Sequence, residues 1–293
     1  MKVLSLFDGI SCGRLALERA GIPVEKYYAS EIDKHAIQVA QKNYPDIIQI
    51  GDCTKVNWNN YKDVDIIIGG SPCQDLSIIK CANREGLHGE KSKLFWEYIR
   101  ALSTIKPKYF LLENVASMKA EDRDAITAVL KAMYPETTCW LIDSALVSAQ
   151  QRKRYYWTNW EIDQLEDKGI VLKDIMEDLV ETKYFYNHPL TNIDLTKQVC
   201  ATMQYKNYKM HKRILNPEFK CQTLTTCGGG NTQKKVYING RARKLTPIEY
   251  ERLQTLPDNY TAGMADSHRY NTIGNGWTVD VIAHILKQIP TEQ

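Results

Sequence analysis

The first part of the chain, to about residue 160, alternates short apolar runs with amphipathic stretches, which constrains its fold more than any other feature. The apolar runs are rich in β-branched residues, and the stretches between them repeat apolar positions at helical spacing. This alternation is typical of βαβ units, which build a mainly parallel sheet. The sequence therefore predicts an α/β protein with strands at Lys2–Leu6, Tyr27–Ser30, Ile47–Ile50, Val64–Ile68, Tyr109–Leu112, Cys139–Asp143 and Tyr155–Thr158.

Helices are predicted between these strands and near the end of the chain. The residue patterns place Asp33 as the N-cap of one helix, and Thr246 with Glu249 as a capping box at the start of another. Between residues 181 and 243 the periodicity is weak, which predicts a smaller, irregular region. The predicted helices are Cys12–Ala20, Lys34–Asn43, Lys93–Ile105, Asp122–Met133 and Thr278–Gln288.

Composition excludes several classes of protein. Of the 293 residues, 43% are hydrophobic and 25% charged, as in ordinary globular proteins. No apolar run approaches the roughly 18 residues that a membrane-spanning helix needs. The sequence shows no charged leader followed by an apolar region, so we expect no secretory signal. The eight cysteines form no C-x-x-C pair and no histidines stand at metal-ligand spacing, so we expect free thiols, no metal and a cytoplasmic location.

Basic residues are concentrated in one segment. Between Lys197 and Lys244 there are eleven lysines and arginines against one acidic residue, Glu218. The whole chain holds 38 basic and 35 acidic residues, so the remainder is acidic. A basic segment in an otherwise acidic protein predicts contact with a polyanion, although a solvated, lysine-rich region would show the same excess.

A cysteine follows the apolar run Val64–Ile68 within the stretch Gly69-Gly70-Ser71-Pro72-Cys73-Gln74-Asp75. Ligands of open α/β sheets bind at the carboxyl ends of the strands, where this cysteine is expected. A thiolate at that position is a candidate nucleophile. The alternatives are a cysteine that only packs in the core and a redox cysteine, for which no resolving partner lies nearby in the sequence.

Acidic residues follow the first three predicted strands. The loop Phe7–Gly13 contains small residues that let the backbone approach a ligand, and Glu31 stands where a carboxylate can bind ribose hydroxyls. Asp52 could accept a hydrogen bond from an adenine amino group. Phe7 and Ile32 could pack against the two faces of the same adenine ring. The full G-x-G-x-x-G pattern and a phosphate-binding lysine loop are absent, which favours a nucleoside without a phosphate chain.

Glu113 follows the fifth strand, beside the expected position of Cys73, and is suited to donating a proton. It could instead only cap a helix or tie down a loop. Arg152 and Arg154 lead into the last predicted strand and would alternate along an extended backbone, so they are expected to share one face. Two guanidinium groups on one face require carboxylates, phosphates or a polar substrate edge.

Five motifs in this order make the chain resemble the cytosine-C5 DNA methyltransferase family over most of its length outside about residues 160–240. Details near Cys73 and Trp277 are similar to de novo DNA methyltransferases, and the chain as a whole to compact prokaryotic or phage-borne enzymes. The first loop, F-D-G-I-S-C-G, and Gly276-Trp277 depart from the commoner family forms. The motifs are Pro72-Cys73-Gln74, Glu113-Asn114-Val115, Gln150-x-Arg152-x-Arg154, Arg243-x-Leu245-Thr246-x-x-Glu249 and Gly274-Asn275-Gly276-Trp277.

The resemblance implies a Rossmann-like, S-adenosylmethionine-dependent methyltransferase sheet with a smaller, irregular target-recognition domain. The catalytic, cofactor-binding domain would comprise residues 1–180 and 244–293, and the target-recognition domain residues 181–243. The implied cofactor is S-adenosyl-L-methionine. Its implied contacts are Phe7, Asp8, Gly9, Gly13, Glu31, Ile32, Asp52, Cys53, Pro72, Asn275 and Trp277.

The implied reaction is methyl transfer to carbon 5 of a cytosine flipped out of double-stranded DNA. Cys73 would add to C6 of the base, protonated Glu113 would bind its N3 and amino group, and Arg154, with Arg152, would contact O2 or the nearby backbone. A tRNA cytosine-C5 methyltransferase and an inactive DNA-binding relative are the alternatives. The implied DNA contacts are Gln74, Ser77, Gln204, Lys206, Lys209, His211, Arg213, Thr225, Thr226 and Arg243.

Overall fold

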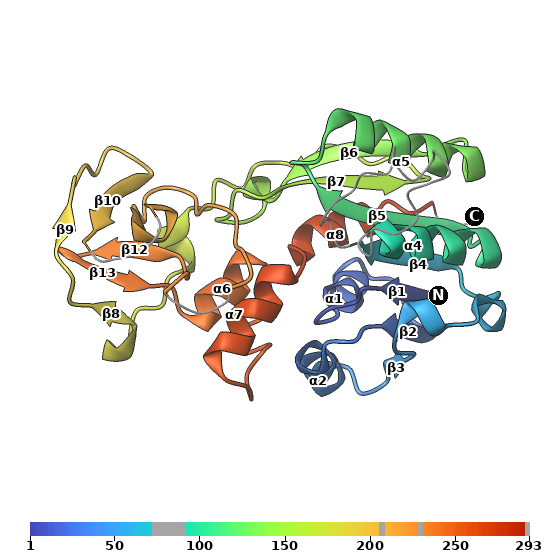
Figure 1. Ribbon diagram of the computed structural model, residues 1–293, viewed down its shortest axis with the longest axis horizontal. Helices are drawn as coiled ribbons and strands as arrows, with labels where there is room; N and C mark the ends of the chain where they lie inside the picture. The colour runs from blue at the N-terminus through green and yellow to red at the C-terminus, as the bar shows by residue number, and fades with distance from the viewer. Residues whose placement is uncertain (72–91, 205–208, 228–230, 291–293) are drawn as a thin grey trace. The chain divides into compact units, whose positions relative to one another are not determined.

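The computed structural model describes residues 1–71, 92–204, 209–227 and 231–290, and Figure 1 labels most of its α-helices and strands. The chain forms two compact units. Unit 1 comprises Met1–Ile142, Lys153–Gln164 and Val281–Gln293, and unit 2 comprises Asp143–Arg152 and Leu165–Asp280. The predicted catalytic and target-recognition domains are functional divisions and stay a prediction.

Unit 1 contains a seven-stranded sheet with the order β3-β2-β1-β4-β5-β7-β6. β1 pairs in parallel with β2 and β4, and β5 pairs in parallel with β4 but antiparallel with β7. All seven predicted strands are present, with bounds shifted by at most a few residues. They are β1 (Lys2–Leu6), β2 (Lys26–Ser30), β3 (Ile48–Gln49), β4 (Ile66–Gly70), β5 (Tyr109–Val115), β6 (Thr138–Asp143) and β7 (Lys153–Thr158).

The strand order reverses beside β1. The chain leaves β1 to form β2 on one side, and later returns to form β4 on the other side. Ligands of open α/β sheets bind outside the carboxyl ends of the strands at such a switch point. The loop after β1 and the residues after β4 therefore stand at the favoured ligand-binding edge of unit 1.

Helices α4 and α5 contribute apolar side chains to the core of unit 1, together with the central strands. Tyr98 of α4 is fully buried, and its hydroxyl donates to the carbonyl of Leu111 at 3.0 Å. A Cβ atom on Gly69 would lie 3.0 Å from this ring and from the Leu6 carbonyl, so the close packing requires glycine. The long helices and the last helix are α1 (Cys12–Arg19), α2 (Lys34–Asn43), α4 (Ser92–Ile105), α5 (Ala120–Met133) and α8 (Val279–Leu286).

Unit 2 contains a six-stranded sheet with the order β8-β13-β12-β11-β10-β9, in which β11 and β12 are parallel. The sequence does not predict these strands, because they span only two to five residues and show little alternation. They are β8 (Phe185–Tyr186), β9 (Leu190–Thr191), β10 (Val199–Met203), β11 (Arg213–Leu215), β12 (Lys235–Ile238) and β13 (Arg241–Lys244). Unit 2 also contains α6 (Pro247–Leu253) and α7 (Asp266–Asn275).

Both predicted helix caps are confirmed. The Asp33 carboxylate accepts from the amide of His35 at 2.8 Å at the start of α2. At the start of α6, the Thr246 hydroxyl accepts from the Glu249 amide at 3.1 Å, and the Glu249 carboxylate accepts from the Thr246 amide at 2.8 Å. Short 3₁₀ helices complete the structure at Cys53–Lys55, Trp58–Tyr61, Ser144–Leu146, Leu172–Ile175, Thr182–Tyr184 and Lys209–Lys212.

Candidate functional site

The loop after β1 has a left-handed backbone conformation at several residues, and hydrogen bonds to a buried carboxyl group stabilise it. Phe7, Gly9 and Ser11 have φ near +60°, and for the two non-glycine residues this conformation is strained. The buried carboxyl of Asp8 accepts from the Tyr27 hydroxyl at 2.6 Å and from the Ser11 hydroxyl. Burial raises the pKa of Asp8 to about 6. Asp8 thus supports the loop from its buried side.

The Glu31 carboxylate, at the end of β2, organises the neighbouring backbone. One oxygen accepts from the amides of Ile32 and Asp33, at 2.7 and 2.8 Å, and the other accepts from the Gly9 amide at 2.8 Å. A carboxylate oxygen can accept more than one hydrogen bond, so the second oxygen can also receive a hydroxyl. The Ile32 side chain is 77% exposed beside this carboxylate, which provides an apolar surface next to a polar acceptor.

Asp52 follows β3 and caps the 3₁₀ helix Cys53–Lys55. Its carboxylate accepts from the amide and the hydroxyl of Thr54, at 3.0 and 2.8 Å, and these hydrogen bonds lower the pKa of Asp52. Burial raises the pKa of Cys53 to about 11, so this thiol is not a nucleophile at neutral pH. Asp8, Glu31 and Asp52 thus follow three adjacent strands, which brings three carboxyl groups to one edge of the sheet.

A second cluster lies at the ends of β4, β5 and β7. Gly70 pairs with Glu113 across β4 and β5, and the Arg154 guanidinium approaches the Glu113 carboxylate with an Nε–Oε1 distance of 2.9 Å. Both side chains are largely buried. The Asn114 amide donates to the Ser71 hydroxyl at 3.1 Å, which ties β5 to the end of β4. Ser71 directly precedes Pro72 and Cys73, which lie outside the described residues together with Gln74 and Ser77.

Arg152 has a different environment from Arg154. It precedes β7 and belongs to unit 2, so the prediction that the two arginines share one face of a strand is wrong. Its buried guanidinium donates to the carbonyls of Leu224, Gly274 and Gly276 at 3.1–3.3 Å. Arg152 therefore joins two segments of unit 2 through their backbone.

Two glutamines extend this buried network. The Gln150 amide donates to the Gln254 side chain at 3.1 Å and accepts from the Leu224 amide at 2.8 Å. The Gln254 amide donates in turn to the carbonyls of Ile273 and Gly276, at 3.0 and 2.9 Å. The network fixes the residues around Leu224 against the end of α7. The sequence predicts no role for Gln254, because no local pattern distinguishes it from a solvated glutamine.

Gly274 allows these two segments to approach closely. A Cβ atom at this position would lie 2.5 Å from the carbonyl oxygen of Thr225, which is a severe clash. Thr225 and Thr226 are exposed, as is Asn275, and Trp277 is half-buried. The predicted DNA-contacting threonines and the predicted cofactor contacts Asn275 and Trp277 therefore lie in neighbouring segments of unit 2.

Several cations of the basic segment form hydrogen bonds within unit 2 and are therefore not available to a ligand. Lys220 and Lys235 each donate to three backbone carbonyls. Arg243 is 2% exposed and forms two hydrogen bonds with the fully buried Glu249, at 2.6 and 2.7 Å. A contact between Arg243 and DNA stays a prediction, and it would require this ion pair to open.

Other predicted DNA contacts lie nearer the surface. Gln204, Lys209 and Arg213 are exposed, His211 is half-buried, and Lys206 lies outside the described residues. Among the residues that the structure describes, no group of three or more histidine, cysteine or acidic side chains could hold a metal ion. Within the same ranges, no helix is long and apolar enough to span a membrane.

The switch-point sheet, with its carboxylates after three adjacent strands, gives unit 1 the form of an open α/β fold that binds nucleotides or nucleosides. The family model of C-5 cytosine-specific DNA methylases matches residues 1–291, and the chain belongs to this family. The family predicted from sequence is confirmed, and the chain is a DNA cytosine-5-methyltransferase.

Individual relatives are similar over nearly their whole length. The Type II methyltransferase M.NlaX of Neisseria lactamica is 28% identical over 98% of this chain and 96% of its own. M.HhaI of Haemophilus parahaemolyticus is 26% identical over 99% and 94%. The Dnmt2 methyltransferase of S. pombe has a TM-score of 0.73 at 16% identity, over 98% of this chain and 97% of its own, which confirms the predicted fold class.

Proposed function

We propose that this enzyme methylates cytosine in duplex DNA through a covalent bond between Cys73 and the base. The observation that carries the proposal is the cluster at the ends of β4, β5 and β7. There Arg154 orients the Glu113 carboxyl at 2.9 Å, and Asn114 holds Ser71, two residues before Cys73. The family's nucleophile motif thus follows a strand end that is held beside a candidate acid.

The residues after β1, β2 and β3 fit the nucleoside part of S-adenosyl-L-methionine. Glu31 would accept from the ribose hydroxyls, because one of its oxygens accepts only a single backbone amide. The exposed Ile32 would cover one face of the adenine, and Asp52 would accept from the adenine amino group. Strained and glycine positions in the loop Phe7–Gly13 would let the backbone come close. The cofactor would supply an electrophilic methyl group.

Cytosine C5 is a poor nucleophile until C6 has been attacked. The Cys73 thiolate would form a bond to C6, and Glu113 would stabilise the charge that develops on the ring by donating to N3. Arg154 would contact O2 while it holds Glu113 in place. After methylation a base removes the C5 proton, and the bond between sulfur and C6 breaks to release the thiolate.

The target base must leave the helix, which costs a few kcal/mol in lost stacking and pairing. Phosphate contacts from the basic segment would offset this cost. In unit 2, Thr225, Thr226 and the exposed residues Gln204, Lys209 and Arg213 would face the DNA. Because its substrate would be DNA, we propose that the enzyme acts at the bacterial nucleoid or in a phage-infected cell.

Replacement of the nucleophile tests the proposal. Cys73→Ser should abolish methyl transfer to duplex DNA and still bind S-adenosylmethionine. Cys139→Ser is the matched control, because Cys139 lies on β6 and burial raises its pKa to about 11. Its turnover should stay near wild type. Near-normal turnover of Cys73→Ser would remove the covalent role.

Trapping and substrate choice complete the experiment. Duplex DNA that contains 5-fluorocytosine should leave a stable adduct on Cys73 in the wild-type enzyme, located by mass spectrometry. An adduct on another residue would contradict the assignment. Parallel assays with tRNA address the RNA alternative, since preferential transfer to tRNA would overturn the DNA substrate. Bisulfite sequencing of DNA from expressing cells would then give the target sequence.

A further inference from the structure

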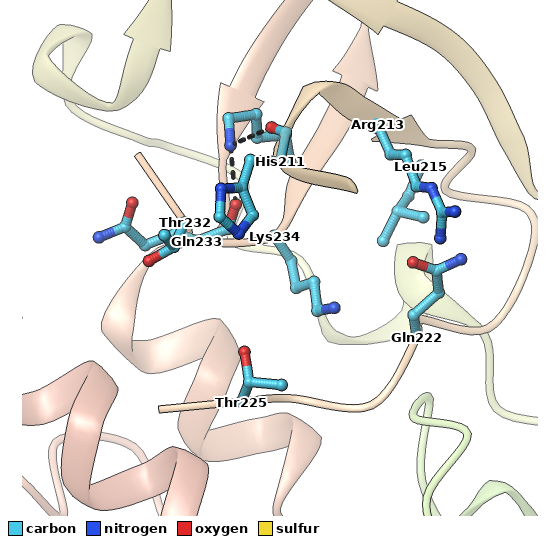
Figure 2. A pocket seen from close by; sticks show the side chains of 9 residues that line it. His211, Arg213, Leu215, Gln222, Thr225, Thr232, Gln233 and Lys234 are labelled. Atoms are coloured by element: carbon cyan, nitrogen blue, oxygen red, sulfur yellow. Dashed lines mark hydrogen bonds between the residues drawn. The ribbon is translucent and has the colours of Figure 1, made fainter. Parts of the chain in front are cut away.

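A hollow in unit 2 is lined by basic and uncharged side chains, and none of its described lining residues is acidic (Figure 2). It lies between the start of β11, the start of β12 and the loop that contains Thr225. Arg213, Lys234 and Lys235 are the cations in its wall, and His211 lies beside them. Such a wall is an unfavourable environment for positive charge unless an anion enters.

The two neighbouring lysines have different partners. Lys235 is 1% exposed and donates to the carbonyls of His211, Asn231 and Gln233 at 2.6–3.0 Å, so all three of its donors are used, while burial lowers its pKa to about 8. Within the described part of the chain, the ammonium of Lys234 has no hydrogen bond or ion pair. Lys235 therefore belongs to the structure of the wall, whereas Lys234 is available to a ligand.

Electrostatics give Lys234 a need for an anion. Burial is the main cause that lowers the pKa of Lys234; Cys221 and Cys227 act in the opposite direction, and the positive charge of Arg213 adds a small further lowering. A negative group between the two side chains would replace lost solvation for Lys234 and relieve the repulsion from Arg213. The two cations in the wall therefore favour an anionic ligand between them.

Further hydrogen-bond donors surround the same hollow. Gln222 and Thr225 contribute an amide and a hydroxyl, and Figure 2 shows them on either side of the Lys234 side chain. The buried hydroxyl of Thr232 has no hydrogen-bond partner among the described residues. Several donors around one point suit a ligand with several acceptor oxygens, such as a phosphate, better than the two acceptors of a base edge.

We propose that this hollow binds a phosphodiester group of the DNA backbone, with Lys234 and Arg213 as its charged partners. The proposal rests on the proposed function, because it takes DNA as the ligand. It adds Lys234, Gln222 and Thr232 to the DNA contacts and gives them a common anion. Arg213, which the sequence predicts only as a DNA contact, is thereby assigned to a phosphate.

The salt dependence of DNA binding tests the site. Each lost phosphate contact lowers the slope of log K against log salt by about 1, so Lys234→Gln should bind about tenfold more weakly at roughly 0.1 M salt. The loss should be equal for a target duplex and an unrelated duplex, and Lys234→Arg should keep the wild-type slope. Binding is measured by fluorescence anisotropy between roughly 50 and 200 mM salt.

Lys173→Gln is the matched control, because Lys173 also lies in unit 2 but pairs with Glu218 and does not line the hollow. It should keep the wild-type slope. An unchanged slope in Lys234→Gln would overturn the site, and so would a loss confined to the target duplex, which indicates base reading. A wild-type enzyme whose DNA binding is insensitive to salt, or that transfers no methyl group to DNA, would instead contradict the proposed function.

Discussion

At the sheet edge of unit 1, carboxylates accept hydrogen bonds from backbone amides and keep part of their surface exposed. Glu31 and Asp52 both follow this pattern. In unit 2, cations of the basic segment are instead buried and donate to backbone carbonyls or to a buried carboxylate, as Lys235 and Arg243 do. Glu31 and Asp52 thus keep acceptor surface for a ligand, whereas the number of charges in unit 2 overstates how many can contact DNA.

The contrast is tested most severely at Arg243. Arg243→Ala would leave the fully buried Glu249 carboxylate without its cation, and breaking a buried ion pair costs about 3–5 kcal/mol. Urea unfolding should show this loss. The exposed pair of Lys173 and Glu218 is the comparison, because Lys173→Ala should cost at most about 1 kcal/mol. Similar costs for the two variants would show that Arg243 is not structural.

The second prediction concerns Asp8, which follows β1 and, unlike Glu31 and Asp52, is buried. Its native pKa is about 6, above its ordinary value of 3.8, so the folded protein holds a proton that the unfolded chain releases between these values. Stability of the wild type should therefore fall as pH rises from about 4 to about 6. The Asp8→Asn variant lacks this loss, which amounts to up to about 3 kcal/mol for two pKa units.

The measurement is urea unfolding of wild type and Asp8→Asn at pH 4, 5, 6 and 7. Asp52 should respond in the opposite direction, because hydrogen bonds from Thr54 lower its pKa. The stability that Asp52 contributes is present above the unfolded pKa and is lost as pH falls through the native one. Parallel stability curves for wild type and Asp8→Asn would place the Asp8 carboxyl in contact with water.

The third prediction concerns the close approach at Gly274 in unit 2. Alanine would place a Cβ atom 2.5 Å from the Thr225 carbonyl, and such overpacking costs about 1–3 kcal/mol. At a solvent-exposed position inside a helix, replacing glycine by alanine raises the free energy of unfolding by up to about 1 kcal/mol. The sign of the change therefore shows whether the close contact with Thr225 is rigid. Ser267→Ala, at an exposed position of α7, should stay within about 0.5 kcal/mol. A more stable Gly274→Ala would mean that Thr225 moves freely.

Sequence predicted unit 1 better than unit 2 because the relevant signals in unit 1 are local. The strand Ile66–Gly70 contains β-branched residues in succession, and Asp33 caps a helix by accepting from an amide only two residues along the chain. The partners of Arg152, in contrast, lie 72 to 124 residues further along the chain, so no local pattern distinguishes a guanidinium that joins backbone segments from one that binds a substrate. The two-residue strands β8 and β9 are likewise too short to show a period.

The smallest expected effects are at the two helix caps. One cap lies in each unit, and both were predicted from the sequence, so they allow a direct comparison of the units. Asp33→Ala removes a partly exposed cap in unit 1 and should cost about 1 kcal/mol. Thr246→Ala in unit 2 should cost about 2 kcal/mol, because the buried hydroxyl also donates to the Glu177 carboxylate. Lys34→Ala, on the exposed first turn of α2, serves as the reference and should stay within about 0.5 kcal/mol. Equal losses of unfolding free energy for the two cap variants would mean that burial in unit 2 adds nothing to a local hydrogen bond. The contrast between the units would then rest on the ion pair of Arg243 and Glu249 alone.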